Sequence, residues 1–167
     1  MHWHRVAATT LGACVLAVAL SACSTTVHLE PAKFSNDPEC ADVSVLLPDT
    51  VGDLERVWTD AQATGAWGEP TVVLRCGVIP PGPSPDVCTT IGGVDWLVLG
   101  QEEDRQRLVT YGRDPAVEII IQREADIDFR AVVESLSNSI GSGLQTATAS
   151  CSDSVSTGDS VENEPAG

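Results

Sequence analysis

Two stretches of the chain repeat apolar residues at the spacing of an α-helix. In the first, apolar residues recur between Cys40 and Leu47 on one face, by i, i+3 and i+7 spacing. Asp37 precedes this pattern and suits the N-cap, because its side chain can accept hydrogen bonds from free backbone N–H groups. Pro38 suits the first helical position, and Pro48 ends the helix.

The second helix is predicted from about Asp128 to Ile140, with Asp126 or Asp128 as its cap and Gly141 or Gly143 at its end. Its apolar residues form a single stripe: Phe129, Val132, Val133, Leu136 and Ile140.

Between these helices, short runs of β-branched and other apolar residues bounded by Gly and Pro predict strands. The runs are Leu54–Thr59, Thr71–Cys76, Asp95–Leu99, Arg107–Tyr111 and Ala116–Gln122. Asp60–Pro70 is rich in Gly, Ala and Thr and is predicted as a loop. Pro80–Pro85 is also a predicted loop, because four prolines in six residues exclude a helix or a central strand.

Short, closely spaced strands between two helices favour an α+β fold over an alternating α/β fold. We predict a small antiparallel sheet of about four to five strands with two helices packed on one face. One domain is expected over residues 37–151. Residues 152–167 are mostly Ser, Asp, Glu, Gly and Thr, and they predict a disordered acidic tail.

A further apolar run, before these elements, has the pattern of an export signal. Arg5 precedes an apolar stretch that ends in Leu20, Ser21, Ala22 and Cys23. The stretch suits a signal-peptide core and is short for a membrane-spanning helix, which needs roughly 20 apolar residues. Small residues directly before a cysteine resemble the bacterial lipobox, in which that cysteine receives a lipid.

We therefore predict a lipoprotein signal peptide over residues 1–22, lipid attachment at Cys23 and a flexible tether over residues 23–36. The predicted location is the extracytoplasmic face of the cell membrane. The alternatives are a secreted protein cleaved near Ala22 and an uncleaved membrane anchor.

Charge narrows the class of partner. The chain has 24 acidic and 9 basic residues and a formal net charge of −15. Nucleic-acid binding is disfavoured, because it depends on Lys and Arg neutralising phosphates. The expected contacts are with the membrane, through the lipid, and with another protein of the cell envelope.

Four cysteines besides Cys23 follow the signal: Cys40, Cys76, Cys88 and Cys151. An even number in an exported chain predicts disulfides, and three pairings are possible. We predict Cys76–Cys88, which would close the proline loop, and Cys40–Cys151. No metal site is predicted, because no C-x-x-C pair is present and the single histidine after the signal lies in the tether. No cofactor is predicted either.

No catalytic residue is predicted. A Ser or Cys nucleophile needs a base, usually His, and His28 and Lys33 both lie in the predicted tether. Asp95, Asp114 and Glu118 leave open an acid and base pair of the kind that hydrolyses sugars. Solvated strand faces and ordinary turns are the alternative explanation for these three carboxylates.

Several residues are candidates for ligand binding. Arg75 and Arg113 suit an anion, because guanidinium groups bind carboxylate and phosphate in a bidentate manner; pairing with nearby acids is the alternative. Trp67 and Trp96, with Trp58, suit a sugar-stacking surface, and the alternative for them is a place in the core.

Three blocks of sequence are similar to an actinobacterial family catalogued as domain of unknown function 3515. They are Ala66–Val78, Gly93–Leu97 and Gly112–Ile119. The resemblance covers roughly Cys40 to Ile140. It implies a protein of the actinobacterial envelope and no particular activity.

Three functions follow from these observations. The favoured one is a non-enzymatic interaction or accessory module, tethered to the outer face of the membrane, because the chain combines a predicted anchor and disulfides with no recognisable catalytic set. The alternatives are a lipoprotein that binds a small ligand, either a glycan or an anion, and a carboxylate-based hydrolase.

Overall fold

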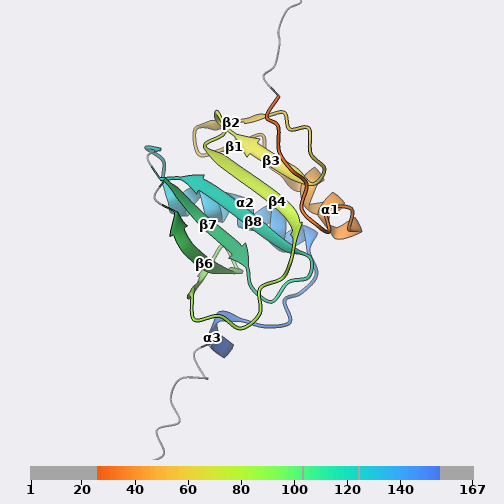
Figure 1. Cartoon of the computed structure of the whole chain (residues 1–167), viewed down its shortest axis with the longest axis vertical. Coiled ribbons are helices and arrows are strands. Elements are labelled where there is room, and N and C mark those ends of the chain that lie inside the picture. The colour runs from red at the N-terminus through yellow and green to blue at the C-terminus, as the bar shows by residue number, and fades with distance from the viewer. Residues whose placement is uncertain (1–25, 103, 124, 155–167) are drawn as a thin grey trace, which may run out of the picture.

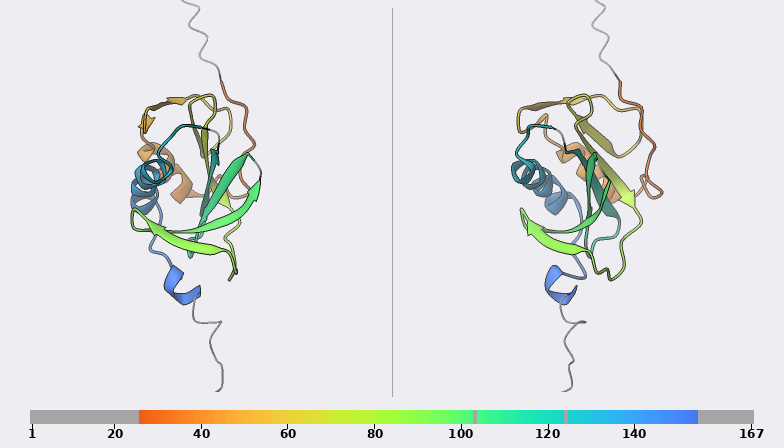
Figure 2. Two further views of the ribbon diagram at one scale, coloured as in Figure 1. Left: turned by 90° about the vertical axis from the view of Figure 1, so that its left-hand side faces the viewer. Right: turned by 60° about the vertical axis from the view of Figure 1, so that its left-hand side comes forward.

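The computed structural model describes residues 26–102, 104–123 and 125–154. An eight-stranded antiparallel sheet forms its centre, and α1 and α2 lie together on one face of this sheet (Figures 1 and 2). The fold is α+β, as predicted, but the predicted sheet of about four to five strands is wrong. The predicted signal peptide, Cys23 and residues 155–167 of the predicted tail lie outside the described residues.

The elements, in chain order, are α1 (Pro38–Leu46), β1 (Thr50–Val51), β2 (Leu54–Val57), β3 (Thr64–Trp67), β4 (Val72–Val78), β5 (Val87–Ile91), β6 (Val94–Glu102), β7 (Arg105–Thr110), β8 (Ala116–Gln122), α2 (Phe129–Gly143) and α3 (Cys151–Ser154). The strand order across the sheet is β1-β2-β3-β4-β8-β7-β6-β5. Two four-stranded meanders therefore meet where β4 pairs with β8.

The register at this seam separates an apolar face from a charged face. Ile119 of β8 is paired with Leu74 of β4 and with Leu108 of β7, and all three belong to the core under the helices. Successive residues of a strand point to opposite faces. Glu118 and its partner Arg75 therefore point to the face that the helices leave open.

Both helices begin where the sequence predicts. Asp37 accepts a hydrogen bond from the backbone N–H of Glu39, and Asp128 accepts one from Ala131. The helices then pack closely, because a Cβ on Gly143 would lie 2.8 Å from the backbone nitrogen of Val43. The predicted apolar stripe of α2 faces the core.

Three strands were not predicted: β1, β3 and β5. β3 lies within Asp60–Pro70, which was wrongly predicted to be a loop. Its Gly65 is a poor strand former by composition, yet all four residues of β3 are buried. A Cβ on Gly65 would lie 2.7 Å from the ring of Trp67, so the missing side chain leaves room for that indole. Pairing and packing determine this strand, and local propensity does not.

The four cysteines form two disulfides, as expected, but the predicted pairing is wrong. Cys40 is bonded to Cys76, and Cys88 is bonded to Cys151. Cys76 lies on β4 at the middle of the sheet, whereas Cys88 lies on the edge strand β5. Four strand spacings of about 4.8 Å each separate them along the sheet, far beyond the reach of a disulfide. Cys40 meets Cys76 because α1 packs over β4.

Residues 27–36 lie along the open face of the sheet (Figure 2). The N–H of Val27 donates to the carbonyl of Trp58 at 2.7 Å, and the N–H of Phe34 donates to the carbonyl of Gly77 at 2.8 Å. A Cβ on Gly77 would lie 2.3 Å from the carbonyl carbon of Phe34, so this close approach requires glycine. These residues were predicted as part of a flexible tether, and the folded domain therefore begins before the predicted residue 37.

The two ends of the described chain lie at opposite ends of the molecule (Figure 1). The N-terminal end lies beside β1 and β2, and α3 lies at the other end. Residues 152–154 of the predicted tail belong to α3. Within the described ranges, no helix is long and apolar enough to span a membrane.

Candidate functional site

The open face of the sheet carries a buried carboxylate held by two arginines. Arg75 donates from Nε to Oε2 of Glu118 at 2.7 Å, and its Nη2 contacts the same oxygen. Arg107 donates from Nε to Oε1. Glu118 is 0% exposed, whereas the side chains of Arg75 and Arg107 are 29% and 46% exposed. The glutamate is therefore the floor of the cluster, and the two guanidinium groups form its surface.

Sheet register brings these side chains together. Glu118 lies in the middle of β8, directly beside Arg75 of the neighbouring β4. Arg107 lies on β7, on the other side of β8, where it is paired with Ile120, two residues along β8 from Glu118 and on the same face. A buried carboxylate is costly unless it is paired and hydrogen-bonded, and both oxygens of Glu118 meet that condition. Fixing the carboxylate also fixes the direction of both guanidinium groups.

A hollow of about 220 Å³ opens above the pair and is lined by Arg75, Arg105, Arg107, Glu118 and Ile120. The local formal charge from these residues is 3 − 1 = +2, in a chain whose net charge is −15. The Nε of Arg105 lies 3.5 Å from a carboxylate oxygen of Asp104, and both side chains are more than half exposed. Such an exposed pair holds Arg105 weakly.

The hollow continues into a groove of about 430 Å³ that shares Arg75, Arg105 and Ile120 with it. Residues 27–30 form one wall of the groove, and Val73 contributes to its apolar floor. The arrangement combines a cationic end with an apolar channel. Chemically, it suits a ligand or a chain segment that presents a carboxylate or phosphate next to apolar groups.

A family model described as a protein of unknown function, DUF3515, matches residues 5–149. The chain belongs to the DUF3515 family. This confirms the resemblance drawn from the three sequence blocks. Comparison with curated proteins and with solved structures finds no match.

Two of the four residues predicted for ligand binding lie in the core of this DUF3515 domain. Trp67 and Trp96 are both 0% exposed. Their indole N–H groups donate to the carbonyl of Pro48 at 3.0 Å and to the hydroxyl of Ser137 at 3.1 Å. Neither ring can stack on a ligand from solvent, so the sugar-binding prediction is wrong for both, and the core alternative is confirmed.

Arg113, the third predicted residue, holds the segment after α2 in place. Its Nη1 donates to the carbonyls of Leu144 at 3.4 Å and Gln145 at 2.6 Å. Burial lowers the pKa of Arg113 from its ordinary value, and the charges of Asp95 and Glu39 oppose that shift. The contacts give Arg113 a structural role, away from the cluster of Arg75 on the open face.

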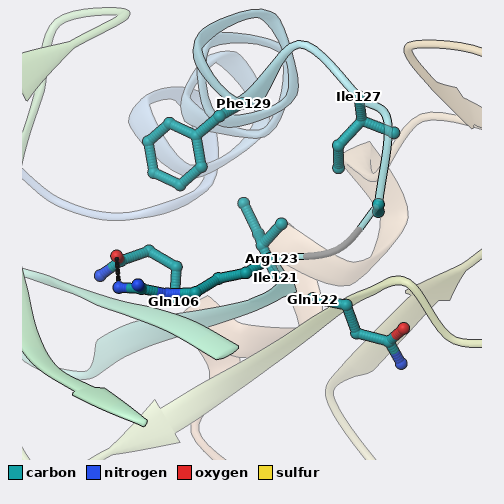
Figure 3. A pocket seen from close by; sticks show the side chains of 7 residues that line it. Gln106, Ile121, Gln122, Arg123, Ile127 and Phe129 are labelled. Atoms are coloured by element: carbon teal, nitrogen blue, oxygen red, sulfur yellow. Dashed lines mark hydrogen bonds between the residues drawn. The ribbon is translucent and has the colours of Figure 1, made fainter. Parts of the chain in front are cut away.

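A second cavity of the DUF3515 domain, about 450 Å³, lies between the end of β8 and the start of α2 (Figure 3). Phe129 and Ile127 lie on one side of it and Ile121 on the other. Arg123 donates to the side-chain oxygen of Gln106 at 2.9 Å, so two of the polar side chains that line the cavity are bonded to each other. This cavity offers a ligand less fixed charge than the arginine cluster does.

The carboxylates considered for hydrolysis are distributed over separate places. Glu118 is held by two arginines, and the oxygens of Asp95 accept from the hydroxyl of Thr90 and the N–H of Cys151. Asp114 is exposed after β7. Among the described residues, no group of three or more His, Cys, Asp or Glu side chains is arranged to hold a metal ion.

Proposed function

We propose that this DUF3515 protein is a lipid-anchored, non-enzymatic binding module on the outer face of the cell membrane. Its binding site is the cluster of Arg75, Arg105 and Arg107, and its partner in the envelope presents carboxylate or phosphate groups. The observation that carries the proposal is the buried Glu118, which orients Arg75 and Arg107 at the surface.

The cluster is preorganised for anions. Arginine loses less freedom on binding when its guanidinium group is already fixed, and Glu118 fixes two of them. Arg75 and Arg107 each direct Nε toward Glu118, and both partly exposed side chains line the hollow. The net charge of the chain is −15, so the field of the whole protein opposes anion binding and a local cluster of cations is needed to overcome it.

The lipid anchor is supported by the sequence and by the disulfides. Cys40, Cys76, Cys88 and Cys151 are bonded in pairs. Neither disulfide uses Cys23, which follows the small residues expected at a lipobox. Two or more acyl chains on one residue give stable membrane binding, because each buried CH₂ contributes about 0.8 kcal/mol.

A small anionic ligand is the second candidate, favoured by the hollow itself. Its volume of about 220 Å³ is suited to a small ion or an acidic group rather than to a drug-sized molecule. The carboxylate-based hydrolase is not proposed, because the one candidate carboxylate in the hollow, Glu118, has both oxygens engaged by arginines.

Cys23→Ala is expected to move the protein from the membrane fraction to the soluble extracytoplasmic fraction, because the acceptor of the lipid is removed. Membrane fractionation and mass spectrometry of the N-terminal peptide measure the change. Cys14→Ala is the matched control, since Cys14 lies inside the predicted signal. Retention in the membrane of Cys23→Ala protein that has lost residues 1–22 would contradict the anchor.

Arg105→Ala is expected to weaken the binding of inorganic phosphate and of citrate by about tenfold, the effect of losing one charge-assisted hydrogen bond. Calorimetric titration of the full chain measures both anions. Arg105 is the suitable target because its ion pair is with Asp104, so its loss leaves the pairs of Glu118 with Arg75 and Arg107 intact.

Arg130→Ala is the control for charge. Arg130 is exposed on α2, on the opposite face, and its loss changes the net charge by the same amount. We expect unchanged affinity for both anions. Equal weakening by the two substitutions, or no effect of Arg105→Ala, would overturn the arginine cluster as the binding site.

A further inference from the structure

Trp58 is the one exposed tryptophan among the described residues. It is 72% exposed, directly after β2, whereas Trp67 and Trp96 are fully buried. Exposing a large aromatic ring to water is unfavourable, and tryptophan is enriched at membrane interfaces, where its ring is buried and its N–H stays hydrated. The position of Trp58 relative to the N-terminal end decides which surface it faces.

The N-terminal segment is bonded to the chain on both sides of this ring. The N–H of Val27 donates to the carbonyl of Trp58 at 2.7 Å, and the N–H of Asp60 donates to the carbonyl of Val27 at 3.3 Å. Cys23 precedes Val27 by four residues. An extended chain spans at most about 3.6 Å per residue, so four residues reach roughly 14 Å at most.

We propose that the end of the domain carrying Trp58 rests directly on the membrane, with the indole of Trp58 in the headgroup region of the bilayer. This inference rests on the proposed lipid at Cys23. Because the connection to the lipid is short, the effective concentration of Trp58 at the bilayer is high. A contact between Trp58 and the membrane that would be too weak without the lipid can then persist. The domain is thereby oriented and is not held away on a long tether.

This orientation leaves the arginine cluster accessible. Figure 1 views the open face of the sheet, with β1, β2 and the N-terminal end together at one end of the molecule. When that end rests on the bilayer, the face carrying Arg75 stands beside the membrane rather than against it. A partner in the envelope can then approach the cluster laterally.

The charges around Trp58 determine which lipids it tolerates. Asp49 and Arg56 line the same cavity as Trp58, and Asp60, two residues after Trp58, is exposed. The hydrogen bond with His28 lowers the pKa of Asp60 below its ordinary value, so Asp60 is charged at neutral pH. These acids repel anionic headgroups over about one Debye length. The contact is therefore stronger on zwitterionic lipid, because the aromatic ring and not charge carries it.

Quenching by brominated lipid tests the inference with the lipidated full chain in phosphatidylcholine vesicles. Bromine near the headgroup is expected to remove roughly one third of the tryptophan emission, because one of three tryptophans after residue 22 is in the interface. Trp58→Phe removes the reporting ring, and its remaining emission should not be quenched. Replacing part of the phosphatidylcholine by an anionic lipid should reduce the quenching of the unmodified chain.

Mass spectrometry of the N-terminal peptide, on the same vesicles, separates the two proposals. A lipidated chain whose emission is not quenched overturns the membrane contact and leaves the anchor intact. An unlipidated Cys23 overturns both. Equal quenching of the Trp58→Phe protein would place another tryptophan in the bilayer and would also overturn the assignment to Trp58.

Discussion

Replacing Cys40 and Cys76 together by alanine is expected to lower the free energy of unfolding by about 4 kcal/mol. The bond joins residues 36 apart, and cutting it releases the corresponding loop in the unfolded chain. Both sulfurs are fully buried between α1 and β4, so their loss also removes core packing. Because domains of this size are stabilised by only about 5–15 kcal/mol, this is a large fraction of the total.

Denaturant unfolding without reductant measures the change, with the slope m monitored for altered compactness of the unfolded state. The Cys88→Ala, Cys151→Ala protein is the matched comparison. The Cys88–Cys151 bond joins residues 63 apart, but it attaches only the short α3 to the sheet. Without the bond, α3 can detach while the rest of the domain stays folded, and the freed residues regain conformational entropy. We expect a loss of about 2 kcal/mol there. Equal losses would contradict the expectation that the buried bond stabilises the domain more than the bond to α3.

The elements that the sequence predicted correctly are those whose signals are local. Asp37 and Asp128 cap their helices, and β8 follows the alternation of its own residues. β3 was missed because glycine has no intrinsic preference for a strand. Gly65 adopts the strand conformation through the pairing of β3 with β4. The sheet was judged too small for the same reason, since short or glycine-containing strands gain their stability from neighbours.

The disulfide pairing and the arginine cluster depend on contacts between distant segments. Arg75 and Glu118 are 43 residues apart, and only the register between β4 and β8 places them side by side. The alternation of Arg105 and Arg107 was a usable signal, because two residues spaced by two on a strand share one face. It did not reveal which carboxylate they would meet. Sequence reasoning therefore selected Arg75 and missed its companions.

Glu118→Leu is expected to destabilise the protein by about 3 kcal/mol, although leucine is close to glutamate in volume. The substitution leaves the guanidinium groups of Arg75 and Arg107 next to each other without their shared carboxylate. The value is at the low end for a broken buried pair, because Arg107 is nearly half exposed and water can solvate it. Thermal or denaturant unfolding of the purified protein measures the loss.

Removing all three charges separates stability from binding. Arg75→Leu and Arg107→Leu, added to Glu118→Leu, remove the unpaired cations, and buried ion clusters replaced by apolar residues are often neutral in stability. We expect the triple variant to recover most of the stability lost by Glu118→Leu, while phosphate and citrate binding is lost with the two arginines. A triple variant less stable than Glu118→Leu alone would show that the arginines stabilise the sheet by their own packing. Anion binding by the stable triple variant would place the site elsewhere.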